Sequence, residues 1–556
     1  MDGDREEVAN HEVCDRKMYS DKRNILQLVA LLKRYGVRKV VCAPGSRNAP
    51  IIGAFVECED FECTSVADER SAGFVAMGMA LKTGRPVAVC VTSGSALLNL
   101  HPAVAEAYYQ QVPLVVISAD RPAAWIGQMD GQTLPQSDVF GTLVKKSVNL
   151  PEVHTDEDEW YCNRLVNEAL SESTRHGKGP VHINVPLSEP LFQYTTSELP
   201  DVRMISHIPT EAIKYFLYAH QTSFKRPLII VGQMSATEAQ KLTDMPEGIA
   251  VVSELLGNMP HAVRGIDAAL NACSNSDELR PDLVITCGGH VVSKRLKSFL
   301  RDTKGLTHWH ISPTGEVVDL FRALRVVFET TPEEFFEQLK EVWNVDGDYA
   351  SEVRHHCMNV PTPTPEYSSL LAVKELMNLL PSWSVLHLAN SSAIRLAELF
   401  PNPNGVEVCA NRGVNGIEGS LSTAIGYAAC DDRLNVLLIG DLSFFYDMNA
   451  LRNEGVRNNL RVVLLNNGGG AIFRNVQGMD VAGESGRLVT AVHATSAEAW
   501  ARSLNFAYFK VTDKESLRIA MVEMTCPYDR PVFIEVFTNA ETDAEELKRY
   551  YEQIKK

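Results

Sequence analysis

The chain has 556 residues, of which 45% are hydrophobic and 22% charged, and its formal net charge is −17 at pH 7. This size and composition predict a globular protein of about three or four domains at roughly 150 residues each. The negative charge argues against non-specific binding to nucleic acids or to anionic membranes, because both carry negative charge themselves.

Three features of the sequence favour the cytoplasm. It has no run of about 18 apolar residues that would span a bilayer. The acidic start, Met1–Glu7, lacks the basic and apolar regions of a secretory signal peptide. The twelve cysteines are scattered and include no Cys-x-x-Cys pair, which argues against a zinc site and fits the reduced thiols of a cytoplasmic protein. We therefore expect a cytoplasmic protein with reduced thiols and no membrane span.

Apolar runs in the first third alternate with amphipathic stretches. The predicted strands are 39–42, 86–91, 113–117 and 181–185, and the predicted helices are 24–35, 69–82 and 96–109. This alternation predicts a parallel sheet whose faces are covered by helices. We expect it to form a first domain over residues 1–190.

The middle of the chain repeats the pattern after a polar, proline-containing stretch near residues 187–205. The predicted strands are 227–231, 250–253, 283–287 and 307–311, and we expect a central domain over residues 200–345. The run Val360–Pro365 then holds three prolines, which favour the extended conformation of a linker.

The last third alternates in the same way, with predicted strands at 385–389, 435–439, 462–466 and 531–537. We expect a third domain over residues 366–556. The predicted fold class is therefore α/β, with three doubly wound domains, each built on a parallel sheet.

Two predicted strands of the last third end in side chains that carry oxygen. Asp441 follows the first strand, and Asn467 follows the second, 26 positions later, with glycines after it. Such oxygens suit a Mg²⁺ ion that holds a diphosphate, and glycines let the backbone approach a bulky anion. We expect Asp441, Asn467 and the carbonyl of Gly469 to bind this metal. Taken singly, Asp441 fits a helix cap and Asn467 fits a turn at least as well.

This spacing is similar to the diphosphate and metal motif of thiamine-diphosphate enzymes, and a set of motifs narrows the resemblance. The motifs are Ala43–Asn48, Asp68–Phe74, Thr92–Ala96, Ser118–Pro122, Asn411–Gly413 and Gly440–Ser443. In order and spacing, the set resembles the 2-succinyl-5-enolpyruvyl-6-hydroxy-3-cyclohexene-1-carboxylate synthase family. One departure is Ala471, which stands within the glycine run.

The resemblance implies a fold of the thiamine-diphosphate-enzyme type. The first domain would bind the aminopyrimidine ring of thiamine diphosphate, and the third would bind the diphosphate with Mg²⁺ or Mn²⁺. Glu69 would hydrogen-bond the aminopyrimidine and promote formation of the reactive carbanion. Ile417 would support the cofactor from beneath, and Ser391 would contact it. From the sequence alone, Glu69 fits an exposed acid in a first helical turn, and Ile417 fits a core residue.

The resemblance also implies a reaction of menaquinone biosynthesis. In it, 2-oxoglutarate is decarboxylated, and the succinyl-semialdehyde carbanion adds to isochorismate in a Stetter-like 1,4-addition. Both substrates carry two carboxylates, which guanidinium groups bind through paired hydrogen bonds. The family's anion-binding positions fall on Ser46, Arg47, Arg121, Gln132, Lys294, Arg295, Ser391, Arg395 and Arg412.

Some of these residues have a second implied role, and others have an alternative interpretation. Arg395 and Arg412 are implied as catalytic residues as well as binding residues. Arg395 follows Ser391 by four residues, so one helix face carries both if a helix starts there. Without the resemblance, Lys294 and Arg295 fit a solvated surface pair.

Two predicted helices carry small residues: Gly73, Ala76, Gly78 and Ala80 in the first, and Gly419, Ala424, Gly426 and Ala428 in the second. This pattern fits close packing within a domain or contact between two related domains. In the thiamine-diphosphate enzymes, the third domain of one chain and the first domain of its partner share the cofactor. The resemblance therefore implies that Glu69 and Asp441 meet across a subunit boundary, in a required dimer and, by family expectation, a tetramer.

Other functions fit less well. A nicotinamide dehydrogenase needs a Gly-x-Gly-x-x-Gly turn, which the sequence lacks, and Gly288–Lys294 departs from the phosphate-binding loop of ATPases. Another 2-oxoacid decarboxylase or an acetolactate-synthase-like enzyme would share Glu69, Asp441 and Asn467 but need not share the arginines. A non-catalytic relative that binds the cofactor stays open as a further alternative, although the full set of donors argues against it.

Overall fold

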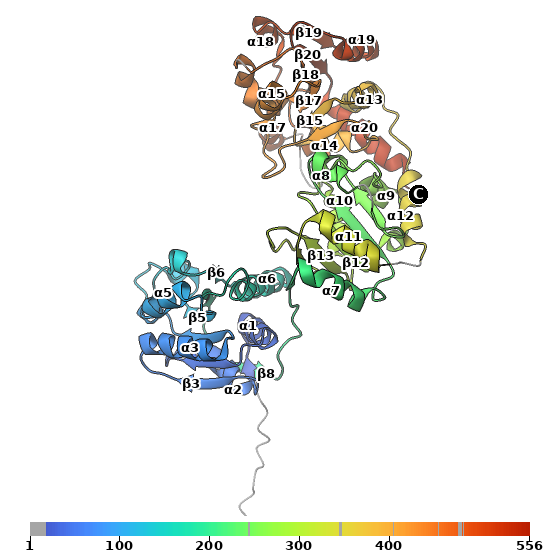
Figure 1. Ribbon diagram of the computed structural model, residues 1–556. Helices are drawn as coiled ribbons and strands as arrows, with labels where there is room; N and C mark the ends of the chain where they lie inside the picture. Colours follow the sequence, from blue (N-terminus) through green and yellow to red (C-terminus); the bar gives the residue numbers. More distant parts are fainter. Residues whose placement is uncertain are drawn as a thin grey trace, which may run out of the picture. The chain divides into compact units, whose positions relative to one another are not determined.

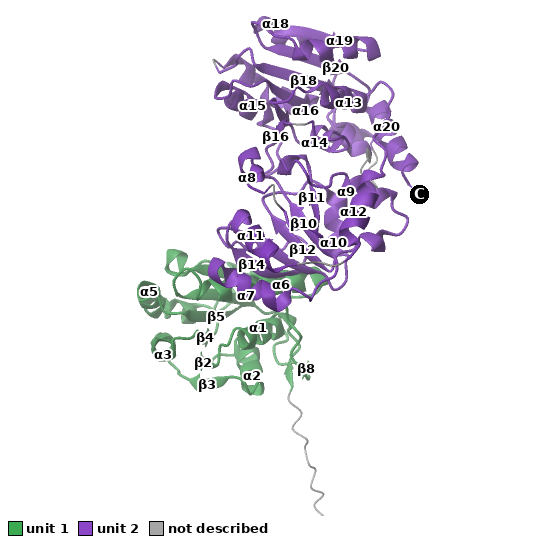
Figure 2. Cartoon of the chain, turned by 45° about the vertical axis from the view of Figure 1, so that its right-hand side comes forward, with its two compact units in different colours: residues 1–207 green, residues 208–556 purple. Residues whose placement is uncertain are grey.

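The computed structural model describes residues 18–242, 245–343, 347–403, 405–453, 455–475, 481 and 483–555. The acidic start, considered above for its charge, lies outside these residues. The chain separates into two compact units, residues 1–207 and 208–556, which Figure 2 shows in green and purple. Three six-stranded sheets form their cores, and the predicted α/β fold class is confirmed. The boundaries of three separate domains stay a prediction.

The sheet of unit 1 is parallel throughout and has the strand order β3-β2-β4-β5-β7-β6. Its strands are β2 Lys39–Cys42, β3 Glu62–Ser65, β4 Val87–Val91, β5 Leu114–Asp120, β6 Lys146–Asn149 and β7 Val181–Pro186. Two short strands, β1 Tyr19–Ser20 and β8 Tyr194–Thr196, form a separate antiparallel pair. The sequence did not predict β3, whose residues are all exposed, because an exposed edge strand lacks an apolar run.

Helices cover both faces of this sheet (Figure 1). They are α1 Arg23–Arg34, α2 Ala49–Glu57, α3 Glu69–Thr83, α4 Ser95–Leu98, α5 His101–Tyr109 and α6 Asp156–Glu172. Alternate strand residues point to opposite faces: Val40 and Ile117 pack with α1, α2 and α6, whereas Val41 and Val116 pack with α3, α4 and α5.

The prediction of a single helix over 96–109 is wrong, because the structure has two helices there, α4 and α5. Pro102 lies in the first turn of α5. It has no backbone N–H and cannot donate to the carbonyl of Leu98, as a continuous helix would require.

The first sheet of unit 2 has the order β11-β10-β12-β13-β14-β9. Its strands are β9 Ser206–Pro209, β10 Pro227–Val231, β11 Ala250–Ser253, β12 Leu283–Cys287, β13 Thr307–Ile311 and β14 Leu324–Glu329. Its helices are α7 Ile213–His220, α8 Ala236–Gln240, α9 Ile266–Ala272, α10 Lys294–Arg301, α11 Pro332–Val342 and α12 Tyr349–Met358. Helices α7 and α11 pack on one face of the sheet, and α9, α10 and α12 on the other.

The second sheet of unit 2 is parallel and has the order β16-β15-β17-β18-β20-β19. Its strands are β15 Val385–Leu388, β16 Glu407–Cys409, β17 Asn435–Gly440, β18 Leu460–Asn466, β19 Ala507–Val511 and β20 Val532–Phe537. Its helices are α13 Ser369–Leu379, α14 Ser392–Ala397, α15 Ser420–Ala429, α16 Asp441–Asp447, α17 Glu484–Thr490, α18 Glu498–Ser503, α19 Lys514–Thr525 and α20 Ala540–Gln553. The predicted strands of the last third lie within about two residues of those observed.

Two further findings concern the described residues. Among the described residues, no helix combines the length and the apolar character needed to cross a membrane. The eleven cysteines in the described part of the chain are all free thiols.

Candidate active site

The cavity that holds most of the predicted residues lies where β15, β17 and β18 end, and its volume is about 530 Å³. β15 pairs with β16 on one side and β17 on the other, so the winding direction reverses there. Such switch points are where open α/β sheets bind ligands. The predicted residues that line it are Lys294, Arg295, Ser391, Arg395, Ile417, Asp441, Asn467 and Gly469.

Asp441 is the centre of the hydrogen-bonding network at one end of this cavity. It begins α16 and is only 3% exposed. Its Oδ2 accepts the backbone N–H groups of Asn467, Gly468 and Gly469 at 3.1, 2.9 and 3.0 Å, and its Oδ1 accepts that of Leu442 at 2.7 Å. Burial raises the pKa of this carboxyl, and the N–H groups oppose the rise. The network holds the ends of β17 and β18 together.

Asn467 and Gly469 lie beside Asp441 in a fixed conformation. The Asn467 amide donates through Nδ2 to Asp543 at 2.9 Å, so its Oδ1 is the atom it can offer to a cation. Gly469 has a φ of 144°, and a Cβ there would meet the Thr490 carbonyl oxygen at 2.7 Å. Only glycine fits this position. Two side-chain oxygens beside open backbone match the donors that Mg²⁺ takes when it holds a diphosphate.

Two neighbours of this cluster were missed by the sequence analysis. The Nε2 of His493 lies 3.4 Å from Asp441 Oδ2. Asp543 accepts the backbone N–H of Ser369 at 2.7 Å as well as the Asn467 amide. Neither residue belongs to a recognisable motif, and the only available signal was that Asp543 follows β20, the strand next to β18.

The predicted residues around β15 lie close together. Ser391 has a φ of 70° and precedes α14, so it does not share a helix face with Arg395, contrary to one of the expectations. The two are linked instead by a 2.8 Å hydrogen bond from Arg395 Nη1 to the Ser391 carbonyl. Arg412 donates to Asn390 Oδ1 at 2.7 Å. Burial lowers the pKa of Arg412, and the nearby charge of Arg395 lowers it further.

Ile417 is half-buried and lines the cavity. Its carbonyl accepts the hydroxyl of Ser443 at 2.6 Å, which ties the segment before α15 to α16. The Ile417 side chain is therefore a wall residue of the cavity and not part of the closed core.

Lys294 and Arg295 form the first turn of α10, on the wall contributed by the other sheet of unit 2. Arg295 donates to Asp267 Oδ2 at 2.6 Å and lies over the ring of Tyr551, 5.0 Å from its centre. Lys294 is exposed. Arg295 is therefore partly exposed but has partners within the chain, and its role as an anion-binding residue stays a prediction.

In unit 1, Glu69 is the first residue of α3 and is half-buried. Asp68 caps the helix by accepting the Ser71 N–H at 3.0 Å, so the start of α3 and the position of Glu69 are fixed. The Asn99 amide lies 3.4 Å from Glu69 Oε2.

The predicted anion-binding residues of unit 1 follow the ends of β2 and β5. Arg47 is buried and donates to the Leu187 carbonyl at 2.9 Å and to Glu189 at 3.1 Å. Arg121 pairs with Asp130 at 2.6 Å. Burial lowers the pKa of Arg47, and the charge of Arg121 lowers it further, so the two cations lie near each other. Ser46 and Gln132 are exposed.

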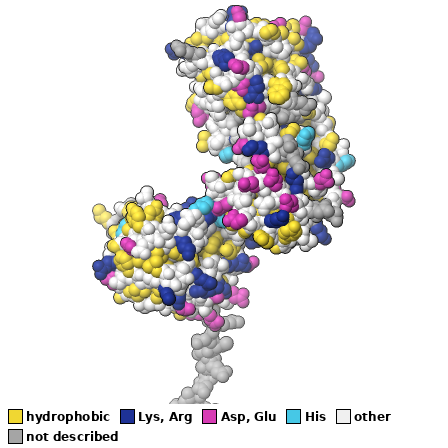
Figure 3. Space-filling view, in the orientation of Figure 1, with side chains coloured by type: hydrophobic (Ala, Val, Ile, Leu, Met, Phe, Trp, Pro, Cys, Tyr) yellow, Lys and Arg dark blue, Asp and Glu magenta, His cyan; other side chains and the backbone are white. Residues whose placement is uncertain are grey.

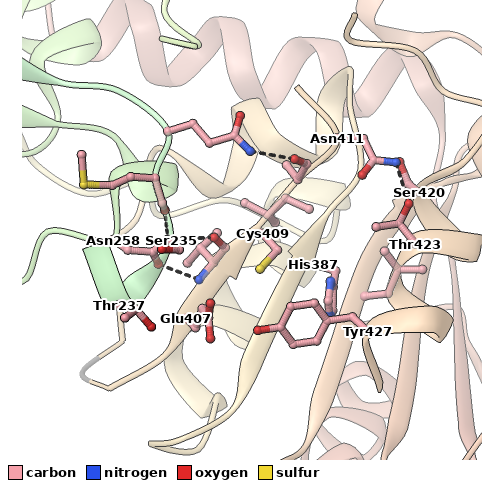
Figure 4. A pocket seen from close by; sticks show the side chains of 16 residues that line it. Ser235, Thr237, Asn258, His387, Glu407, Cys409, Asn411, Ser420, Thr423 and Tyr427 are labelled. Carbon is pink, nitrogen blue, oxygen red and sulfur yellow. Dashed lines mark hydrogen bonds between the residues drawn. The ribbon is translucent and has the colours of Figure 1, made fainter. Parts of the chain in front are cut away.

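A second cavity, of about 540 Å³, lies between the segment after β10 and β16. Asn258, which Figure 4 labels, exchanges two hydrogen bonds with Val408, and Gln233 donates to the Ala410 carbonyl at 3.0 Å. None of the predicted residues is among those that line it. Its walls fix β16 and the segment that leads to Arg412.

Comparison with known proteins gives three consecutive family matches. They are the N-terminal TPP binding domain of thiamine pyrophosphate enzymes over residues 26–140, the thiamine pyrophosphate middle domain over 198–382, and the C-terminal TPP binding domain over 391–536.

Three relatives that match along nearly their whole length share one name. The 2-succinyl-5-enolpyruvyl-6-hydroxy-3-cyclohexene-1-carboxylate synthase of Bacteroides fragilis is 54% identical, over 97% of this chain and 100% of the relative. The synthase of Bacteroides thetaiotaomicron is 53% identical with the same coverage. That of Flavobacterium psychrophilum is 36% identical, over 95% of this chain and 98% of the relative.

Proposed function

The chain belongs to the family of 2-succinyl-5-enolpyruvyl-6-hydroxy-3-cyclohexene-1-carboxylate synthases, which use thiamine diphosphate, and we propose that it catalyses the reaction of that family. In this reaction, 2-oxoglutarate loses carbon dioxide and the remaining four-carbon unit adds to isochorismate, a step of menaquinone biosynthesis. The main support for the proposal is the 54% identity to such a synthase along nearly the whole chain.

Asp441, Asn467 and the carbonyl of Gly469 would hold a Mg²⁺ or Mn²⁺ ion and, through it, the diphosphate of the cofactor. The proposal is supported by their oxygen atoms, which are of the kind Mg²⁺ prefers, and by the four N–H groups that fix Asp441. When bound, thiamine diphosphate supplies the nucleophilic carbon and the electron sink for decarboxylation.

Glu69 would hold a proton at the aminopyrimidine ring, and Ile417 would support the cofactor from the cavity wall. Glu69 suits this role because the capped start of α3 gives its carboxyl a defined position. A carboxyl group that shares a proton with a ring nitrogen acts as an acid or a base without leaving its site.

The cations would bind the substrate carboxylates. Lys294, Arg295 and Arg395 line the same cavity as Asp441, which supports a site that brings an anionic substrate to the cofactor. Arg412 lies close enough to Arg395 for their charges to interact. Ser46, Arg47, Arg121 and Gln132 would contribute further donors from unit 1.

A dimer, and by extension a tetramer, is part of this proposal. The side of unit 1 that carries α3 and α5 shows hydrophobic side chains at its surface (Figure 3), among them Phe74, Leu81 and Tyr109. A Cβ placed on Gly78 of α3 or on Gly426 of α15 would meet no atom within 4 Å. Exposed apolar groups and open glycines support packing of these helices against another subunit.

The reaction can be tested with the full-length chain, thiamine diphosphate, Mg²⁺, 2-oxoglutarate and isochorismate. We expect loss of isochorismate absorbance and a product whose mass equals both substrates minus carbon dioxide. Pyruvate in place of isochorismate should give no adduct. Preference for pyruvate would favour an acetolactate-synthase-like enzyme. Bound cofactor without release of carbon dioxide would favour a non-catalytic relative.

A further inference from the structure

Two half-buried glutamates lie in the wall of the main cavity, and neither belongs to the predicted site. Glu254 directly follows β11, and Glu398 directly follows α14. Both line the cavity together with Lys294, Arg295 and Arg395. A carboxylate that is partly removed from water needs hydrogen bonds or a paired charge to stay ionised, so their partners indicate their role.

Glu254 binds the segment that leads into α10. One carboxylate oxygen accepts the backbone N–H of Ser293 at 2.6 Å, and the other accepts that of Val292. Ser293 is the N-cap of α10 and accepts the Leu296 N–H at 2.9 Å. The two residues that follow Ser293 are Lys294 and Arg295. The position of Glu254 therefore determines where α10 and its two cations begin.

Glu398 binds the residue next to Glu254. Its two oxygens accept the Leu255 N–H at 3.0 and 3.2 Å. Glu398 stands three residues after Arg395, so this contact fixes the end of the helix that carries Arg395. The two glutamates thus join the α10 segment of one sheet to α14 of the other sheet, within unit 2.

Charged groups of both signs surround the pair, and the negative charge of Asp267 raises the pKa of both glutamates. Burial raises the pKa of Glu254 and of Glu398, and the charge of Glu254 raises that of Glu398 further. Lys297 opposes the rise at Glu254, and Arg264 opposes it at Glu398. The charges of the two carboxyls act to raise the pKa of Arg264 and of Arg412. The pair therefore lies at the centre of the cations on this side of the cavity.

We propose that Glu254 and Glu398 are positioning residues for substrate binding: together they hold α10 against α14, so that Lys294, Arg295 and Arg395 face one substrate carboxylate group. This inference rests on the proposed function for the identity of the substrate. Neither glutamate needs to contact the substrate or the cofactor. Their effect is on the geometry of the cations that do.

The variants Glu254→Gln and Glu398→Gln test this inference separately. Glutamine keeps the volume of glutamate but offers one acceptor oxygen, so Glu254→Gln loses one of the bonds to Val292 and Ser293. We expect KM for one of the two substrates to rise about tenfold to a hundredfold. The same substrate should be affected in both variants and in Lys294→Met. We expect kcat to change by less than about threefold, and the affinity for thiamine diphosphate to stay unchanged.

Glu407→Gln is the matched control, because Glu407 is a mostly buried acid of the same unit that pairs with Arg433 on the second cavity. It should leave KM unchanged. A double-mutant cycle adds a sharper readout: Glu254→Gln should have little further effect on KM in the Lys294→Met background, because the cation it positions is gone. Additive effects in this cycle would overturn the inference, as would unchanged KM values or a parallel fall in kcat and cofactor affinity.

Amide hydrogen exchange keeps the inference testable apart from turnover. Glu254→Gln should speed exchange at Val292 and Ser293 in the holoenzyme, whereas Glu407→Gln should not. If the wild-type chain shows no turnover, the proposed function is contradicted but this inference is not. The exchange experiment would still decide whether Glu254 holds the segment before α10. If exchange at Val292 and Ser293 in Glu254→Gln equals that of the wild type, the inference is wrong. If Glu254→Gln does not fold, Glu398→Gln and exchange at Leu255 provide the same test.

Discussion

Replacing Glu69 by glutamine is expected to lower kcat by about 10²- to 10⁴-fold, the usual contribution of a general acid–base group. Glutamine has nearly the same shape, and the cap of α3 by Asp68 does not depend on residue 69. The variant should therefore fold and bind thiamine diphosphate normally while its amide cannot hold the carboxyl proton. Steady-state rates of isochorismate loss measure the first effect, and quenching of tryptophan fluorescence by the cofactor measures the second.

A matched control for this change is Glu172→Gln, which alters an acid of α6 on the opposite face of the same sheet. Glu172 pairs with Arg175, and its loss should leave kcat within about twofold. A Glu69→Gln variant that keeps more than about a tenth of the wild-type kcat would show that this carboxyl does not take part in the chemistry.

Replacing Asp441 by alanine is expected to have the second largest effect, through loss of the cofactor. Asp441 would supply the charged oxygen ligand, so we expect the affinity for Mg²⁺ and thiamine diphosphate to fall by about a hundredfold or more. The change also leaves four backbone N–H groups without their acceptor. Each group that water cannot reach costs about 1–3 kcal/mol. The melting temperature should therefore fall even without cofactor.

Asp441→Asn separates these two effects. Asparagine keeps one oxygen for the N–H groups but removes the charge, so the melting temperature should recover more than the cofactor affinity does. Isothermal titration with Mg²⁺ and thiamine diphosphate measures the affinity, and calorimetry measures the melting temperature. Normal cofactor binding by Asp441→Ala would contradict the assignment of the metal site.

Much of the fold could be predicted from the sequence, because buried parallel strands appear as short apolar runs between amphipathic helices. The prediction also left out strands, among them the apolar β14 and β19, and two of its errors have a local cause. The strand β3 is exposed and therefore not apolar, and a single proline divides α4 from α5. The fold class depends on the alternation of strands and helices, so it was unaffected by these errors.

The candidate site was predicted in part, for a related physical reason. Asp441 and Asn467 follow strands whose carboxyl ends are neighbours in the sheet, so their proximity could be expected from the pattern alone. Glu254 and Glu398 could not be predicted, because they meet only after two different sheets have formed. Arg47 and Arg121 were predicted as anion donors, but their present partners are Glu189 and Asp130, which a substrate carboxylate would have to replace.

We propose that Glu69 of one subunit and Asp441 of its partner complete one cofactor site. The direct test is to produce Glu69→Gln and Asp441→Ala chains together with different tags, and to measure the activity of dimers that carry both tags. One of the two sites in such a dimer would contain neither change, so we expect about half the activity of a wild-type dimer purified in the same way. If Glu69 and Asp441 of the same chain form the site, each site contains one change, and the mixed dimer will be as inactive as either variant alone.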